Sequence, residues 1–333
     1  MKRRRFQKML FFAGITAAPL IGVRAQPKPK LRIGCASPGG SRNDRATGFT
    51  ALFERLGELG YVEGRNLEVD FVLAPDSQDV LGAYKAFVRR GADLLLAMGS
   101  DIPLLAARVA AAGRVPIVML ATDYDPLEAG YVESLARPAG NLTGVYIRQP
   151  EVATKQVELA HELFPGNRRL IVWIDQAVRQ QAEAALRAAR SLGLDAQLLC
   201  DTAIECSWTD TFGSAFQRIQ SFGSPPTLLP GSPFMRLYRD MICRMALERR
   251  IPLIAPQREF VEAGALISYG VRLDDAYRQV ADYISRIAGG TKPADLPIEQ
   301  PTRFELSVNK RTARELGIAL PPIILARADE VIE

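Results

Sequence analysis

Polar side chains that could bind a small molecule directly follow apolar runs in the first half of the chain. They are Ser37, Ser100 with Asp101, and Asp123. Backbone N–H groups at the start of a helix bind anions such as carboxylates, and serine hydroxyls add hydrogen-bond donors. An aspartate at the same edge can accept an ammonium group, so the set suits a zwitterionic or polar ligand. Serine and aspartate are also ordinary N-caps of helices, so each residue taken singly has a structural explanation.

The sequence lacks the residue patterns of enzymes and of metal centres. His161 is the only histidine, and it falls inside the helical pattern from Glu151 to Phe164. A single histidine without clustered cysteines gives no zinc site. No serine–histidine–aspartate arrangement can be placed, and the glycine-rich patterns of dinucleotide and ATP sites are missing. We therefore predict no enzyme activity, no catalytic residue, no metal and no cofactor.

Short apolar runs alternate with longer amphipathic stretches from Lys30 onward. The apolar runs predict strands at 31–37, 67–73, 92–99, 116–122, 142–147, 169–175, 195–200, 226–229, 252–255 and 266–271. The stretches between them predict helices at 43–59, 78–90, 102–112, 129–136, 151–164, 176–192, 209–222, 234–249 and 274–288. Strands that are apolar throughout are typical of a parallel sheet with helices on both faces. The fold class is therefore α/β, with two doubly wound parallel-sheet units in succession.

Ligands of doubly wound sheets bind outside the carboxyl ends of the strands, and that is where the polar residues named above fall. Trp173, Cys35 and Cys243 lie within apolar segments and are expected in the core. Cys200 and Cys206 could form a disulfide across a loop in an oxidising compartment, but we favour free thiols.

The first 25 residues have the pattern of a secretory signal peptide. Five cationic side chains precede an uncharged run from Met9 to Val23, and small residues near Ala25 predict cleavage before Gln26. The run contains Gly14 and Pro19 and is shorter than the roughly 20 apolar residues that span a membrane. Arg3 to Lys8 fits the twin-arginine pattern, and a general secretory signal explains it equally well. We expect a soluble periplasmic protein.

The charge balance changes when this segment is removed. The chain has 42 basic and 37 acidic residues, and six basic residues precede Gln26. The remaining chain therefore has 36 basic residues against 37 acidic ones. Because the positive excess belongs to the export segment, nucleic acid is not an expected partner.

Four segments spread along the chain carry a family resemblance. They are ELGYVEGRN at 58–66, SLARPAGNLTG at 134–144, REFVEAG at 258–264 with SYG at 268–270, and KPADLPIEQPTRFEL at 292–306. In this order they resemble the substrate-binding proteins of ABC importers, in the group labelled tryptophan/tyrosine-type.

The resemblance implies the type I periplasmic-binding-protein fold, with two lobes joined by a hinge and closing on a ligand in the cleft. Lobe 1 would comprise 30–147 plus 272–302, and lobe 2 would comprise 150–269 plus 305–333, with a C-terminal helix over 310–316. The family's site loops map onto Ser37, Ser100, Asp101 and Asp123, with Ser232 and Tyr269 facing them from lobe 2 or the hinge. The implied partners are a small amino-acid-like ligand and the transmembrane subunits of an ABC permease, and we expect a monomer.

Two other functions use the same features. An exported ligand-sensing module that regulates a membrane receptor needs the same fold and the same export, so the sequence leaves it open. An enzyme on this scaffold would need turnover that depends on residues such as Asp101 or Asp123, for which the sequence offers no catalytic pattern.

Overall fold

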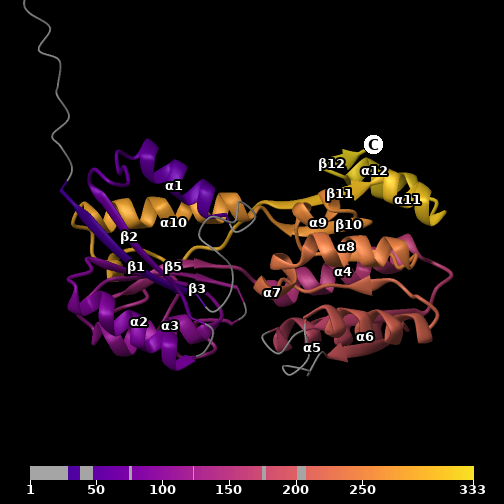
Figure 1. Ribbon diagram of the computed structural model, residues 1–333, viewed down its shortest axis with the longest axis horizontal. Coiled ribbons are helices and arrows are strands. Elements are labelled where there is room, and N and C mark those ends of the chain that lie inside the picture. The colour runs from indigo at the N-terminus through magenta and orange to yellow at the C-terminus, as the bar shows by residue number, and fades with distance from the viewer. Residues whose placement is uncertain (1–28, 38–47, 75–76, 123, 175–177, 201–207) are drawn as a thin grey trace, which may run out of the picture.

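The computed structural model describes residues 29–37, 48–74, 77–122, 124–174, 178–200 and 208–333. The predicted signal peptide, Asp123 and the proposed Cys200–Cys206 disulfide lie outside what these residues can show. The described part of the chain forms two sheets, each covered by helices on both faces (Figure 1). This architecture confirms the α/β fold class. We call the two halves lobe 1 and lobe 2.

Lobe 1 contains a parallel sheet with strand order β2-β1-β3-β4-β5. The strands are β1 Leu31–Ser37, β2 Leu67–Leu73, β3 Leu94–Gly99, β4 Ile117–Ala121 and β5 Leu142–Tyr146. Its helices are α1 Phe49–Glu58, α2 Ser77–Arg89, α3 Asp101–Ala111 and, from much later in the chain, α10 Leu273–Ala288. Strand β4 and the last strand of the order, β5, are buried along their whole length, because helices cover both of their faces.

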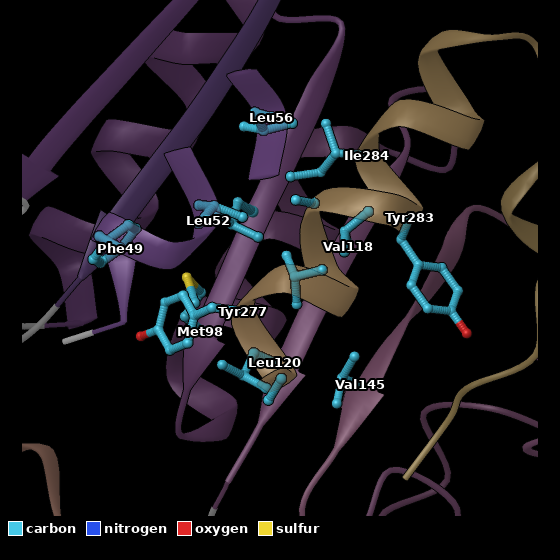
Figure 2. Packing of buried hydrophobic residues seen from close by; sticks show 14 of the residues in the cluster. Phe49, Leu52, Leu56, Met98, Val118, Leu120, Val145, Tyr277, Tyr283 and Ile284 are labelled. Carbon is cyan, nitrogen blue, oxygen red and sulfur yellow. The ribbon is translucent and has the colours of Figure 1, made fainter. Parts of the chain in front are cut away.

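Helix α10 lies beside α1 on lobe 1, although more than 200 residues separate them (Figure 1). Its buried residues recur every three or four positions, at Leu273, Ala276, Tyr277, Val280 and Ile284 among others, which gives the helix one apolar face. Figure 2 shows this face packed against strand side chains such as Val118 and Leu120. The second face of the same sheet is covered by α2 and α3.

Lobe 2 contains a mixed sheet with strand order β12-β11-β10-β9-β8-β6-β7. The strands are β6 Arg169–Ile174, β7 Asp195–Cys200, β8 Thr227–Leu228, β9 Leu253–Ala255, β10 Ile267–Val271, β11 Phe304–Asn309 and β12 Glu330–Ile332. Its helices are α4 Gln149–Leu163, α5 Arg179–Ser191, α6 Trp208–Ser221, α7 Pro233–Leu237, α8 Arg239–Glu248, α9 Arg258–Glu262, α11 Lys310–Leu316 and α12 Pro322–Arg327. Only β11 runs antiparallel to its neighbour β10 among the described pairs.

The predicted core residues are buried as expected. The Trp173 ring has no exposed surface and meets Phe212 and Phe216 edge-on, with ring centroids 5.9 and 5.2 Å away. Cys35 and Cys243 are buried free thiols, one in each lobe. Burial raises the pKa of both thiols to about 12, so neither is a reactive thiolate at neutral pH.

The chain passes between the lobes at three places within the described residues. It leaves β5 and enters α4 through Ile147 and Arg148, and it returns from β10 to α10 through Arg272. The third passage leads from Glu299 to the start of β11 at Phe304. Glu299 belongs to lobe 1, because it forms a β-bridge with Val145 of β5. Figure 1 shows the second and third passages side by side along the upper edge of the molecule.

Several predicted elements are wrong. The helix expected at 129–136 is a series of turns, because Asp125 Oδ1 accepts hydrogen bonds from the backbone N–H groups of Leu127 and Glu128, and Gly130 follows in the left-handed region at φ 69°. The single helix expected at 234–249 is divided into α7 and α8. Strands β11 and β12 and helices α9 and α12 were not predicted.

Candidate ligand-binding cleft

The carboxyl ends of β1 and β3 bring two predicted site residues, Ser37 and Ser100, to one edge of lobe 1. Ser37 ends β1, and Ser100 follows β3 as the N-cap residue of α3. The backbone N–H of Thr122 donates to Gly99 O at 3.1 Å, which joins the ends of β3 and β4. Since β1, β3 and β4 are adjacent strands, Ser37, Ser100 and the segment before Asp123 lie together. Asp123 itself is outside the described residues.

Two hydroxyl groups at this edge are not used by the local fold. The Ser100 side chain makes no capping hydrogen bond to α3, although Ser100 occupies the N-cap position. The buried Thr122 Oγ1 has no hydrogen-bond partner within the described part of the chain. Buried polar groups are normally paired, so these hydroxyls are available to a polar ligand. Thr122 directly precedes the predicted site residue Asp123.

Asp101 is held in place by a tyrosine from a loop. It is the first residue of α3, and its Oδ2 accepts a hydrogen bond from Tyr131 Oη at 3.2 Å. The pKa of Tyr131 is raised, first by burial of the phenol and then by the negative charge of Asp101. The carboxylate therefore stands at the N-terminus of α3 with one hydrogen bond already made and further lone pairs free to accept a ligand group.

Ser232 lies at the corresponding edge of lobe 2. It is buried and follows β8, and its Oγ accepts a hydrogen bond from the backbone N–H of Met235 at 3.3 Å. The neighbouring Gly231 donates its N–H to Gln181 Oε1 at 2.8 Å. A Cβ atom at Gly231 would lie only 2.7 Å from Gln149 Nε2, so glycine leaves room for that buried amide. Sequence reasoning missed Gln149. Its position directly after the first passage between the lobes is the signal that would have identified it.

Tyr269 lies apart from the other predicted residues. Its ring stacks on Phe304, with centroids 5.8 Å apart and planes 7° from parallel, and it packs against the apolar cluster beneath α4. The next residue, Gly270, lines a cavity on the opposite face of β10. Contact between Tyr269 and a ligand therefore remains a prediction, and the described residues do not bring it to Ser37 or Ser100.

Two cavities lie where the lobes meet. One has a volume of about 350 Å³ and joins the lobe 1 residues Asp125, Glu128 and Tyr146 to residues of α5 such as Arg187. Tyr146 Oη donates to Asp125 Oδ2 at 3.0 Å, and burial, together with this carboxylate, raises the pKa of the phenol. The other cavity, about 330 Å³, lies at the passage from β10 to α10. The carboxyl edges of the two sheets therefore face one another, with polar side chains on both sides.

Glu259, which lines the second cavity, is a half-buried carboxyl group that sequence reasoning missed. Its Oε2 has no hydrogen-bond partner within the described part of the chain. Burial raises the pKa of Glu259, the nearby Asp274 raises it further, and Arg236 opposes the change. A raised pKa in the folded state means that the protonated form is favoured on folding, so its contribution to stability is complete below pH 4.5 and is lost as the pH rises.

The variant Glu259→Gln is therefore expected to be more stable than the wild type at pH 7, by about 1 kcal/mol, because a neutral amide costs less to bury than a carboxylate. At pH 4 the two proteins should unfold at nearly the same temperature. Thermal unfolding at both pH values checks this, with Glu133→Gln, an exposed site, as the control. An equal gain for Glu259→Gln at both pH values would contradict the stated origin of the effect.

Membrane and metal features were searched over the described residues alone. No helix among them has the length and apolar character needed to cross a bilayer. They also contain no group of three histidine, cysteine, aspartate or glutamate side chains placed to hold a metal ion.

A family model and a curated relative both match most of this chain. The model of the family described as ABC transporter substrate binding protein matches residues 41–332. A curated relative, the "Tyrosine-binding protein" of Clostridioides difficile (strain R20291), is 26% identical over 276 residues, which is 80% of this chain and 75% of the relative.

Solved structures share the fold. An ABC domain from Streptococcus pneumonia in complex with L-Trp superposes with a TM-score of 0.77 at 24% identity, over 91% of this chain and 100% of that chain. A conserved domain protein from Vibrio cholerae gives a TM-score of 0.78 at 24% identity, over 91% and 99% of the two chains. The family model covers most of the chain, and its members bind solutes and are not enzymes. This protein belongs to the ABC transporter substrate-binding protein family.

Proposed function

We propose that the protein is the periplasmic solute receptor of an ABC importer and that it binds an amino-acid-like ligand between its lobes. The division that we propose places 30–147 and 272–302 in lobe 1, and 150–269 and 305–333 in lobe 2. The observation that carries the proposal is the opposition of the two carboxyl sheet edges. There the carboxylates of Asp125 and Glu128 and the phenol of Tyr146 face α5 of lobe 2 across a cavity that both lobes line.

The proposed contacts follow from the chemistry of each group. Ser37, Ser100 and the N-terminus of α3 would donate to the carboxylate of the ligand. Asp101 and Asp123 would accept hydrogen bonds from its ammonium group, and Ser232 would contact it from lobe 2. A ligand that touches both lobes binds the closed form more tightly than the open form, so it shifts the population toward closure. Closure would then present the loaded protein to a permease.

The choice of ligand class rests on the relatives. One is named for tyrosine, and one solved structure of the same fold holds L-Trp. An amino acid carries the carboxylate and the ammonium group that the edge residues of lobe 1 suit. Export through the predicted signal peptide, with cleavage before Gln26, fits a receptor that meets its ligand outside the cytoplasm.

A thermal-shift panel tests the ligand class. Residues 26–333 would be mixed with each of the amino acids, with small carboxylates and with purines. A ligand that binds only the folded state adds about 2.7 kcal/mol of stability at a hundredfold excess over its Kd. We expect the largest shifts from aromatic amino acids. Shifts from purines alone would overturn the proposed ligand class and leave the fold unaffected.

A further inference from the structure

The end of lobe 2 that faces away from lobe 1 contains a cavity with three arginines. Its volume is about 540 Å³, and its cationic side chains are Arg168, Arg169 and Arg250. No acidic residue is among the described residues that line it. The cavity lies at the amino ends of β6, β8 and β9, whereas the candidate ligand cleft lies at the carboxyl ends of the same strands. The two sites are therefore at opposite ends of the strands of one sheet.

Four loops form the cavity, and hydrogen bonds fix them. They follow α4, α6, α8 and α11, each at the end of its helix. Ser224 N donates to Ile219 O at 3.2 Å, and Ile251 N donates to Ala246 O at 2.9 Å. Asn167 ties the first loop, because its side chain exchanges hydrogen bonds of 3.1 and 3.0 Å with the backbone of Arg169. The rim is thus formed before any ligand binds.

The backbone at this rim adopts conformations that non-glycine residues rarely take. Ser224 has φ 51° and Arg250 has φ 57°, both in the left-handed region. Such positions usually hold glycine at the end of a helix, and a side chain there costs roughly 1 kcal/mol or more. At Arg250 the chain accepts this cost at a position that brings a guanidinium group to the cavity.

All three arginines are exposed, and hydrogen bonds position the guanidinium groups of Arg169 and Arg250 without neutralising them. Arg169 Nη1 donates to Phe222 O at 3.0 Å, and Arg250 Nη2 donates to Leu316 O at 3.3 Å. Each group has five N–H donors, so most of them stay free after these bonds. The carbonyls belong to helix ends that carry about half a negative charge each, which is less than the charge of one arginine. Asp195 is the acidic residue on the strand beside Arg169, and it does not line the cavity.

The remaining wall is partly apolar. Phe164, Phe222, Leu316 and Ile318 line the cavity together with Pro225, Pro226 and Pro252, alongside the polar Asn167 and Ser224. A bound group would therefore meet cationic side chains together with rings and aliphatic surface. Bidentate hydrogen bonds from arginine match the oxygens of phosphates and carboxylates.

We propose that this cavity is a second binding site, which takes a small organic oxyanion such as a phosphate monoester with an apolar group attached. The inference does not depend on the ligand of the cleft. Since the two sites lie on opposite edges of the lobe 2 sheet, each can be filled without touching the other.

Titration of the purified protein with phenyl phosphate tests the site by calorimetry at constant ionic strength. We expect saturable binding that is at least fivefold tighter than that of inorganic phosphate, because only the ester contacts the apolar wall. The double variant Arg168→Ala/Arg250→Gln should weaken phenyl phosphate at least tenfold. The matched control is Arg114→Ala/Arg311→Gln, which removes two exposed arginines outside the cavity and should bind like the wild type.

Arg168→Ala alone provides a second variant, because Arg250 also holds the end of α11. It should fold normally and still weaken phenyl phosphate at least threefold. Equal weakening by the control pair would show general charge attraction and would overturn the proposal. The proposal would also be overturned if phenyl phosphate showed no saturable binding to the wild-type protein. The same holds if the protein sedimented with phosphatidylglycerol vesicles but did not bind phenyl phosphate.

Discussion

Replacing Gly270 by alanine is expected to lower the free energy of unfolding by about 3 kcal/mol, at the upper end of what one added methyl group costs in a packed site. A Cβ atom at this position would lie 1.9 Å from the carbonyl oxygen of Pro256. Pro256 O belongs to the backbone after β9, so no side-chain rotation can relieve the contact. Either β10 or the segment after β9 must move, at the point where the chain passes to α10.

The matched control for this prediction is Gly82→Ala. Gly82 lies in helix α2, and a Cβ atom there meets nothing within 4 Å. The same chemical change should therefore stabilise the protein, by about 0.5–1 kcal/mol, since alanine has the higher helix propensity. Urea unfolding followed by circular dichroism gives both values. If the Gly270→Ala variant were as stable as the wild type, the packing described for the passage between the lobes would be contradicted.

Trp173→Ala should cost about 4 kcal/mol, because it removes the largest fully buried side chain of lobe 2 and leaves a cavity between Phe212 and Phe216. Trp173→Phe should cost only about 1 kcal/mol. It keeps a ring in contact with its neighbours and removes an indole N–H that has no hydrogen-bond partner in the described part of the chain. Urea unfolding of both variants measures the difference. Equal losses for alanine and phenylalanine would contradict the stabilising ring packing described between Phe212 and Phe216.

Sequence pattern predicted the strands that form apolar runs, and it missed a strand in which apolar and polar residues alternate. Strand β4 is apolar throughout, so its position was evident from composition. Strand β11 alternates apolar residues with the polar Glu305, Ser307 and Asn309 and therefore gave no apolar run, although Ser307 and Asn309 are fully buried. The turns at 129–136 depend on the Asp125 side chain and on the φ of Gly130, which outweigh the helix propensity of the segment.

The candidate site was predictable on lobe 1 and less so on lobe 2. Ser37, Ser100 and Asp101 follow strands of one parallel sheet, so topology alone brings them together. Tyr269 was chosen as an aromatic residue near a passage between the lobes. The face of β10 on which its ring lies depends on the register with β11, which pairs Tyr269 with Leu306 and which the sequence did not reveal. Gln149 and Gly231 meet only through tertiary packing.

Isothermal titration of residues 26–333 with L-tryptophan and L-tyrosine tests most directly whether the cleft binds an amino acid. We expect saturable one-to-one binding of at least one of them. The variant Asp101→Asn should weaken it at least tenfold, because the amide can still accept the Tyr131 hydrogen bond but lacks the negative charge. Arg114→Ala, at an exposed site of lobe 1, should bind like the wild type. No saturable binding of any amino acid, or unchanged affinity in Asp101→Asn, would contradict the proposed site.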